Sequence, residues 1–261
     1  MEVAVLGSGS KGNATLVRSG RTTILLEAGF SARQIAIRAR LAGFDPDAVD
    51  ALFVSHGHAD HVQGASVYSR RHRSVAYLPD SAHEALCRSL RGRPVRYHAR
   101  AGLAPGESVE IGSMTVRTFP VPHDAEETMG FVVEAEGMRF GYVTDLGHVT
   151  ALVVERLRGC DALLIEMNHD PDLLREGPYP WDLKQRIASR HGHLSNEQGA
   201  ALLESTLGSD TRVILLGHLS ETNNQPVIAL NSARLAVERL GRGDVRVMPA
   251  EPHGPSPAVR L

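Results

Sequence analysis

The segment VSHGHADHVQG, residues 54–64, places three histidines and one aspartate within six positions, directly after an apolar run. The run ALFV is typical of a buried strand, so the segment forms the loop at the C-terminal end of that strand. His56 and His58 alternate along extended backbone and therefore point to the same side. Asp60 and His61 follow where the chain turns into the next helix. This order predicts two neighbouring pairs of ligands, which suits two metal ions about 3.5–4 Å apart; a polar loop with accidental histidines is the alternative.

Three further coordinating side chains each follow an apolar run elsewhere in the chain. His123 follows RTFPVP, Asp145 follows RFGYVT, and His218 follows RVILLG. Active-site residues of α/β proteins gather at the C-terminal ends of strands. A shared position past three strands therefore favours metal ligands over unrelated polar residues.

The remaining pattern indicates an α/β protein with two sheets. Short apolar runs bounded by Gly, Ser or Asp predict strands, among them two β-hairpins at 107–122 and 129–145 with Gly in their turns. The predicted helices cover residues 31–43, 61–72, 81–90, 149–158, 181–190, 196–207 and 226–240. Many strands with a few covering helices predict a sandwich of two sheets, built as a single domain over residues 1–248. The proline-rich residues 249–261 predict a loose tail.

Composition limits the classes of function. The formal net charge is -2, so no global basic field indicates a nucleic-acid partner, and DNA binding would need a local basic face. Two cysteines, Cys87 and Cys160, are too few for a disulfide framework and indicate reduced thiols. No apolar run reaches the roughly 18–20 residues that span a bilayer, and the first residues lack the pattern of a signal peptide. We expect a cytoplasmic protein without a membrane partner.

The pattern HxHxDH at 56–61, followed by His123, Asp145 and His218, resembles the metallo-β-lactamase superfamily over nearly the whole chain. The resemblance implies a four-layer αββα sandwich of the α/β class, with a dinuclear metal site at one edge of the sheets. It also implies that Asp145 bridges the two ions and that each ion takes three more residues: His56, His58 and His123 for one, and Asp60, His61 and His218 for the other. One residue departs from the pattern, because the family usually has Asp in the motif DAG and this chain has Glu27 in EAG. A glutamate can still accept a hydrogen bond from a ligand histidine; an ordinary carboxylate at a strand end is the alternative.

Two symmetric metal sites bridged by Asp145 suit phosphodiester cleavage, because two ions can clamp the attacking and leaving oxygens and hold a hydroxide for in-line attack. Manganese and zinc both accept His and Asp ligands. We predict Asp60, Asp145 and His193 as catalytic residues, with His193 binding the scissile phosphate or protonating the leaving oxygen. Ser195 is predicted to cap the next helix with Gln198 as its capping-box partner, which makes that helix N-terminus an anion site. Simple capping beside exposed histidines is the alternative.

Two other segments are candidates for substrate contact. GSGSKGN, residues 7–13, is a loop in which Ser10, Lys11 and Asn13 could hold a phosphate, although a tight hairpin would have the same composition. EMNHD follows a buried strand and places Asn168, His169 and Asp170 at the same edge, where they could position substrate.

The segments LGSGSKGN, HGHADH, MNHD, HGHLSN and GHLSETNN together resemble the YycJ/WalJ-type members of the superfamily. That resemblance implies exonuclease activity on DNA, from 5′ to 3′, and a role in DNA repair. Phosphonate-pathway phosphodiesterases of the superfamily carry an extra cysteine-rich zinc site, which the two separate cysteines of this chain do not match. An enzyme that cleaves small cyclic phosphodiesters stays open as the alternative function. A DNA-binding module without catalysis would need no complete ligand set.

DNA ends, of a duplex or a single strand, are the expected partner, and they require basic side chains. Eight arginines lie between residues 70 and 100, and among them Arg91 and Arg93 are predicted to contact the phosphate backbone. A solvated helix face is the alternative. Trp181 and Tyr179 could stack on a terminal base or pack as core or lid residues.

Overall fold

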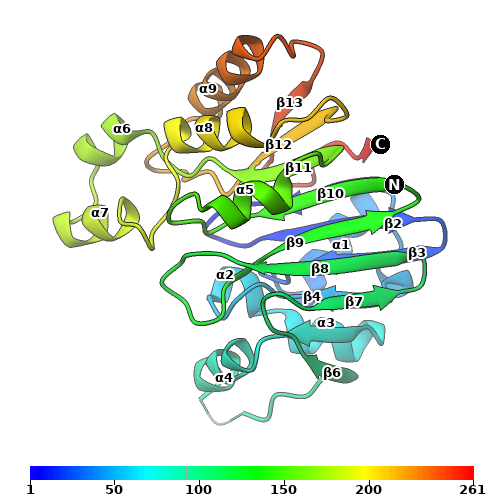
Figure 1. Ribbon diagram of the computed structural model, residues 1–261. Helices are drawn as coiled ribbons and strands as arrows, with labels where there is room; N and C mark the ends of the chain where they lie inside the picture. The colour runs from blue at the N-terminus through cyan, green and yellow to red at the C-terminus, as the bar shows by residue number, and fades with distance from the viewer. Residues whose placement is uncertain (92) are drawn as a thin grey trace. The chain divides into compact units, whose positions relative to one another are not determined.

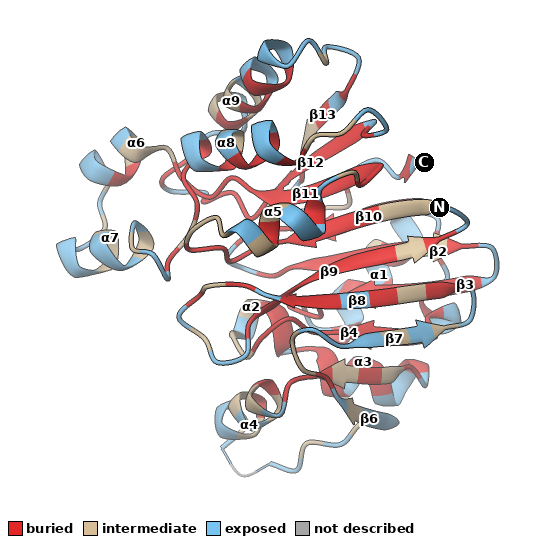
Figure 2. Cartoon of the chain, viewed as in Figure 1, coloured by how far each residue is buried: buried red, intermediate tan, exposed pale blue. Residues whose placement is uncertain are grey.

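The computed structural model describes residues 1–91 and 93–261, and these form two compact units. Unit 1 comprises residues 1–118, 125–129 and 251–260, and unit 2 comprises residues 119–124 and 130–250 together with Leu261. Each unit has its own apolar core, in which buried strands pack against helices (Figure 1, Figure 2).

Unit 1 contains a mixed sheet. Its strands are β1 (Glu2–Gly7), β2 (Ala14–Ser19), β3 (Thr22–Leu26), β4 (Ala51–Phe53), β5 (Val75–Leu78), β6 (Ala99–Gly102) and β14 (Val259–Arg260). Its helices are α1 (Ala32–Leu41), the 3-10 turn η1 (Pro46–Ala48), α2 (Ala59–Val62), α3 (Ala65–His72) and α4 (Asp80–Ser89). The strand order is β14-β1-β2-β3-β4-β5-β6, in which β1 to β3 pair antiparallel and β3 to β6 pair parallel. The predicted hairpin 107–122 forms as β7 (Ser108–Ile111) and β8 (Met114–Pro120).

Two helices of unit 1 show how far local sequence sets their ends. α1 begins as predicted, because the hydroxyl of Ser31 accepts a hydrogen bond from the Gln34 N–H at 3.3 Å. The helix predicted over residues 81–90 begins one residue earlier. α4 starts at Asp80 itself, with Pro79 before it, and the Asp80 carboxylate pairs with Arg100 at 2.8 Å.

The helix predicted over 61–72 is interrupted at Gly64, between α2 and α3. The Gly64 N–H donates to the Ala28 carbonyl at 2.8 Å, so the chain passes close to the segment after β3. A Cβ at this position would lie 2.0 Å from the Phe30 carbonyl oxygen, and only glycine allows the approach. The interruption fixes the direction of α2, which carries two of the predicted ligands.

The proline-rich C-terminal segment contributes to unit 1 rather than forming a loose tail. β14 pairs antiparallel with β1, with Val259 opposite Val3. The Ser256 N–H also donates to the Val5 carbonyl at 2.8 Å. The single domain over residues 1–248 stays a prediction.

Unit 2 contains the second mixed sheet. Its strands are β9 (Met129–Ala135), β10 (Met138–Val143), β11 (Ala162–Glu166), β12 (Val213–Gly217) and β13 (Arg246–Pro249). Its helices are α5 (Ala151–Leu157), α6 (Pro171–Glu176), α7 (Trp181–Ile187), α8 (Asn196–Thr206) and α9 (Pro226–Arg239). The strands of this sheet that lie in unit 2 follow the order β13-β12-β11-β10-β9; β9 and β10 form the predicted antiparallel hairpin, and β10 to β13 run parallel. The C-terminal ends of β10, β11 and β12 therefore meet at one edge of the sheet. Among the described residues of the whole chain, no helix combines the length and apolar character needed to cross a membrane.

Candidate metal centre

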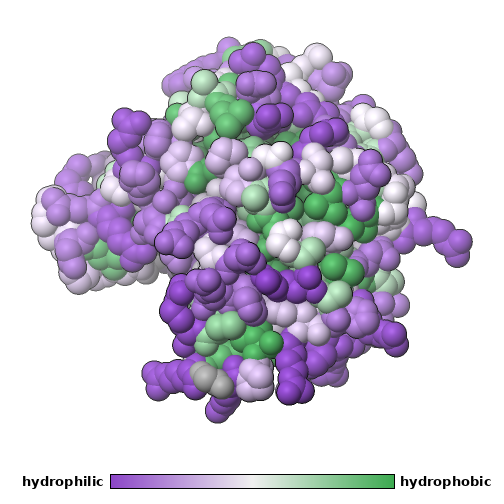
Figure 3. All heavy atoms as spheres, turned by 60° about the horizontal axis from the view of Figure 1, so that its bottom comes forward, coloured by the Kyte–Doolittle hydropathy of each residue, from purple (hydrophilic) through white to green (hydrophobic). Residues whose placement is uncertain are grey.

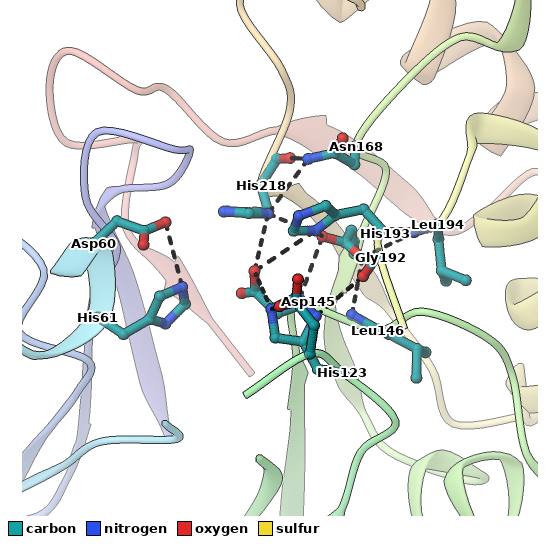
Figure 4. Close-up of polar contacts among 12 residues, drawn as sticks. Asp60, His61, His123, Asp145, Leu146, Asn168, Gly192, His193, Leu194 and His218 are labelled. Carbon is teal, nitrogen blue, oxygen red and sulfur yellow. Dashed lines mark hydrogen bonds and ion pairs between the residues drawn. The ribbon is translucent and has the colours of Figure 1, made fainter. Parts of the chain in front are cut away.

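The histidine-rich loop of unit 1 has the local geometry that its sequence predicts. It leaves β4, and His58 occupies the N-cap position of α2 with extended backbone, at φ -67° and ψ 146°. The rings of His56 and His58 have centroids 4.6 Å apart, and those of His56 and His61 lie 4.3 Å apart. Asp60 Oδ2 lies 3.6 Å from His61 Nε2 (Figure 4). The four predicted ligands of this segment therefore cluster within one turn.

Glu27, the residue directly after β3, supports this cluster through contacts of its carboxylate. Its backbone lies in the left-handed region at φ 66°, a conformation that costs a non-glycine residue about 1–3 kcal/mol. Its buried carboxylate accepts a hydrogen bond from the Ser55 N–H at 3.2 Å and lies 3.3 Å from His61 Nδ1. The Ser55 hydroxyl lies 2.9 Å from His56 Nδ1. The expected contact between Glu27 and a predicted ligand histidine is thus present.

Asn13 belongs to the same cluster, whereas its neighbours in the GSGSKGN loop do not. The Asn13 side chain is fully buried, and its Nδ2 lies 3.0 Å from His61 Nε2. Its Oδ1 accepts a hydrogen bond from the Gly9 N–H at 3.0 Å. Ser10 and Lys11 are exposed at the tip of the loop. The geometry gives Asn13 a position against a predicted metal ligand and leaves Ser10 and Lys11 as the surface side chains of the loop.

In unit 2, the predicted ligands Asp145 and His218 follow the parallel strands β10 and β12. One ligand atom from each of Asp145, Glu166, His193 and His218 lies within 4.8 Å of the others (Figure 4). Asp145 and His218 both have φ 54° in the left-handed region. Such strain is typical of functional sites, where the surrounding structure holds a side chain in an orientation that relaxed backbone would not give.

Glu166, the last residue of β11, is the hub of this cluster, and we did not predict it. Its fully buried carboxylate contacts five nitrogens: the backbone N–H groups of Asp145 (3.2 Å), Leu146 (2.9 Å) and Leu194 (3.0 Å), and Nδ1 of His193 and His218 (2.9 Å each). Burial, the largest single influence, raises the pKa of Glu166, but the two imidazoles outweigh it and lower the pKa to about 2. Because both oxygens are occupied by donors, we interpret Glu166 as a support for the ligands rather than a ligand. The available signal was a carboxylate that ends the buried run ALLIE.

His193 lies beside this hub with part of its ring at the surface. Its Nδ1 lies 2.9 Å from Glu166 Oε1 and 3.6 Å from Asp145 Oδ1, and its side chain is 20% exposed. Burial by itself lowers the pKa of His193, but the carboxylates of Glu166 and Asp145 outweigh it and raise the pKa above the ordinary value. The residue can therefore carry a proton while it faces solvent.

His123, after β8, is oriented by a carbonyl group. Its Nδ1 donates to the Gly192 carbonyl at 3.1 Å, which places the lone pair on Nε2. That Nε2 lies 3.7 Å from Asp145 Oδ1 and 3.3 Å from Asp124 Oδ1. The Asp124 carboxylate is also held by Arg186 of α7 at 2.5 Å. Unit 2 thus brings together its three predicted ligands, which are His123, Asp145 and His218.

The predicted ligand histidines fit a metal site because contacts within the protein orient their imidazole rings. Four of the five predicted ligand histidines use Nδ1 for a contact within the protein: His56 with the Ser55 hydroxyl, His61 with Glu27, His123 with the Gly192 carbonyl and His218 with Glu166. Metal-ligating histidines commonly have this support, because it fixes the ring and presents Nε2 to the ion. Imidazole nitrogens and carboxylate oxygens in this proportion suit zinc or manganese.

The structure assigns supporting contacts to two residues predicted to touch substrate. Asn168 is buried, and its Nδ2 donates to the His218 carbonyl at 2.9 Å. The hydroxyl of Ser195 accepts from the Gln198 N–H at 3.2 Å, and the Gln198 side chain accepts from the Ser195 N–H at 2.9 Å. The predicted capping box is therefore present.

The arginines between residues 70 and 100 are all exposed. They lie on α3, α4, β6 and the neighbouring turns, and Arg91 and Arg93 belong to the turn after α4. Arg100 pairs with Asp80 at 2.8 Å, which removes part of the local charge. The side of the molecule that comes forward in Figure 3 is largely hydrophilic, as exposed arginines require. These exposed arginines form a surface that is available to a polyanion.

Residues 22–218 match the family model of the beta-lactamase superfamily domain. The chain belongs to the metallo-β-lactamase superfamily. Exodeoxyribonuclease WalJ of Streptococcus pneumoniae is a relative with 33% identity over 261 aligned positions, which cover 99% of this chain and 97% of WalJ. Exodeoxyribonuclease YycJ of Bacillus anthracis is 30% identical over 243 residues, 93% of this chain and 91% of YycJ. The predicted superfamily and subgroup are confirmed.

Solved structures agree on the fold of this superfamily member. Zn²⁺-bound PqqB from Methylobacterium extorquens has a TM-score of 0.71 at 23% identity and covers 100% of both chains. Human tRNase Z, short form, has a TM-score of 0.68 at 16% identity, with 100% of this chain and 99% of that chain covered. Two mixed sheets flanked by helices match the metallo-β-lactamase fold, so the predicted α/β class is confirmed. The protein is therefore an enzyme of this superfamily.

Proposed function

We propose that this protein is a metal-dependent exodeoxyribonuclease that hydrolyses DNA from the 5′ end. The observation that carries the proposal is the 33% identity to exodeoxyribonuclease WalJ over 99% of the chain, which leaves no large segment of that relative unmatched. The supported histidines in both units are consistent with it, because they provide the ligands that such an enzyme needs. By this proposal the partner is the end of a duplex or single DNA strand, the compartment is the cytoplasm, and the role is DNA repair.

We further propose that the enzyme uses two divalent ions, manganese or zinc. The residues that would hold them are His56, His58, Asp60, His61, His123, Asp145 and His218, with Asp145 shared. Such ions supply Lewis-acid polarisation of phosphate oxygens and a nucleophile at neutral pH. Glu27 and Glu166 keep the ligand rings oriented in the absence and presence of metal, because their contacts are made to Nδ1.

His193 is proposed as the proton donor to the leaving oxygen. Its Nδ1 is held by Glu166 at 2.9 Å, so Nε2 is the atom that can carry a proton toward substrate. Its partial exposure, in contrast to the buried His218, allows contact with a bound strand. Asp60, whose side chain is 20% exposed, is proposed as a further catalytic residue in addition to His193.

The proposed contacts to phosphate come from side chains at the surface. Ser10 and Lys11 lie at an exposed loop tip, and Arg91 and Arg93 are exposed after α4. Ser195, in contrast, is buried; it caps α8, whose dipole favours an anion near its start. These contacts position the backbone of DNA and carry no sequence information.

Digestion of a duplex labelled at either end tests the proposal. Wild type with Mn²⁺ should release the 5′ label before the 3′ label. Asp145→Asn keeps the size of the side chain but weakens it as a ligand, so we expect activity and bound metal, measured by mass spectrometry, to fall by at least about 10²-fold. Asp210→Asn, a change of the same kind at an exposed residue, should behave as wild type.

Two outcomes would overturn the proposal. Metal-loaded wild type that leaves both labels intact but cleaves a small cyclic phosphodiester would be the alternative enzyme. Unchanged digestion and metal content in Asp145→Asn would remove Asp145 from the metal site.

A further inference from the structure

Unit 2 has a cavity of about 220 Å³ that none of the predicted metal ligands lines. It lies between α6 and α7, the two short helices that follow β11 (Figure 1). Its lining includes two apolar side chains, Leu174 and Trp181, and two cationic ones, Arg175 and Lys184. His169 also lines it. Drug-sized ligands usually occupy at least about 300 Å³, so this cavity suits a single small ring system.

Trp181 is unusually placed for a tryptophan. It is the chain's single tryptophan, and it is 67% exposed at the first position of α7. Figure 2 shows α7 as largely exposed, and none of its residues is buried. The indole is therefore not covered as a core residue or a closed lid would be. A large aromatic side chain left in solvent beside a cavity is typical of a ligand-binding surface.

His169 provides a second, independent sign of a ligand. The residue is 3% exposed, and its Nδ1 has no hydrogen-bond partner among the residues that the structure describes. A buried nitrogen in this state costs about 1–3 kcal/mol and is expected to have a reason. Burial, the main cause, lowers the pKa of His169 to about 4, so the ring is neutral at pH 7 and offers one donor and one acceptor.

The charges around the cavity are positive. Lys184 Nζ donates to the Arg175 carbonyl at 2.7 Å, which holds the ammonium group at the end of α6. The Arg175 guanidinium is mostly exposed but pairs with Asp172 at 2.8 Å and with Glu176 at 3.3 Å, so its charge is partly neutralised and Lys184 is the main cation offered to a phosphate. An aromatic face for a base with cations for its phosphate is the combination that binds single-stranded nucleic acid.

The cavity also adjoins the metal-ligand cluster of its own unit. His169 follows Asn168, whose amide holds the His218 carbonyl. The His169 carbonyl accepts the Asn196 N–H at 2.8 Å, at the start of α8. Through His169 the lining of the cavity is thus joined to Asn168, which supports the predicted ligand His218.

We propose that this cavity, the Trp181 pocket, binds one nucleobase of the DNA end by stacking on the indole. The inference rests on the proposed exonuclease function and adds the place where a base near the cleaved phosphate is held. Stacking accepts every base, because each has a π-face. The pocket would therefore hold the end of the strand without selecting its sequence.

Binding can be measured without catalysis because the tryptophan emission of this protein, excited selectively over its five tyrosines, comes from Trp181 alone. The probe is a short 5′-phosphorylated oligothymidylate, titrated in the presence of a chelator. We expect saturable quenching of the tryptophan emission. An oligonucleotide of the same charge whose first nucleotides are abasic should bind more weakly and quench little.

Affinity for a dye-labelled form of the same probe provides the matched comparison. Trp181→Ala should weaken binding about 5- to 150-fold, the range that loss of one base stack produces. Trp181→Phe, which keeps a ring, should recover most of it. Val227→Ala, which truncates another exposed apolar residue of unit 2, should bind as wild type.

The two proposals fail in different ways. If saturating probe leaves the emission unchanged, or Trp181→Ala binds as tightly as wild type, the pocket proposal is wrong even when DNA is digested normally. If the probe quenches Trp181 and the Ala variant binds weakly while metal-loaded wild type digests no DNA, the pocket stands and the exonuclease proposal fails.

Discussion

Replacing Glu166 with glutamine tests the support that we assign to it in unit 2. The carboxylate Oε2 accepts the N–H groups of Leu146 and Leu194, and Oε1 accepts the Asp145 N–H and faces two imidazole Nδ1 atoms. An amide of the same size has one acceptor oxygen and one NH₂ donor. The amide therefore cannot accept hydrogen bonds at both of the positions that the two carboxylate oxygens occupy.

The two amide orientations have different costs. With NH₂ toward Leu146 and Leu194, two buried N–H groups lose their acceptor at about 1–3 kcal/mol each. With NH₂ toward the imidazoles, only the Asp145 N–H loses its acceptor. The rings of His193 and His218 must then both accept a hydrogen bond at Nδ1. The second orientation is cheaper, at about 1–3 kcal/mol, but it moves the proton of His218 to Nε2, the atom proposed to bind metal. We therefore expect modest destabilisation together with a loss of metal affinity of about 10–100-fold.

Urea unfolding of the metal-free protein and a zinc titration measure the two effects. At an m-value of about 3 kcal/mol per M, the midpoint of Glu166→Gln should fall by about 0.3–1 M. Glu155→Gln, on the exposed side of α5, is the matched control and should change neither quantity. If Glu166→Gln lowers the midpoint but binds zinc as tightly as wild type, the carboxylate serves stability alone. If neither quantity changes, the hydrogen-bond reasoning is refuted.

Two further predictions address the DNA surface and the fold. Arg91→Ala with Arg93→Ala should weaken DNA binding at all sequences, and the slope of log affinity against log salt should fall by about 1.8 if each arginine contacts one phosphate of a duplex; an unchanged slope would make them solvated surface residues. Gly64→Ala should destabilise the protein by more than 2 kcal/mol, about the penalty of overpacking, because its Cβ would lie 2.0 Å from the Phe30 carbonyl oxygen. A thermal midpoint equal to that of wild type would contradict the close approach seen there.

Local sequence predicted those features whose determinants lie close together in the chain. The cluster of His56, His58 and His61 needs only a strand end and one turn, and the capping box of Ser195 needs four residues. Both are encoded within a short window, so pattern reasoning was sufficient. The two predicted hairpins are likewise local features, and both are present as antiparallel pairs.

Features that depend on distant segments were missed. α6 has six residues, too few to show helical periodicity, and β14 exists only because the end of the chain reaches β1. Glu166 looked like an ordinary strand end, because its partners Leu194 and His218 lie 28 and 52 positions away. The interruption at Gly64 likewise depends on Phe30. For β14, Glu166 and Gly64 the deciding contact is tertiary, and no local propensity reports it. α6 differs, because its Asp170 cap and Pro171 are local signals of a helix start that we did not use.

Glu27 and Glu166 show that the two units use the same physical device. Glu27 directly follows β3, accepts the Ser55 N–H beyond the parallel neighbour β4, and contacts His61 Nδ1. Glu166 ends β11, accepts the N–H groups beyond its parallel neighbour β10, and contacts His218 Nδ1.

Each carboxylate is fully buried, which is tolerable only because N–H donors and an imidazole surround the charge. What this device requires is an anionic oxygen that reaches both the next strand end and a histidine ring. A glutamate meets that requirement in unit 1, where the resemblance led us to look for aspartate. The departure at Glu27 therefore changes the length of the support and keeps the chemistry that orients the ligand.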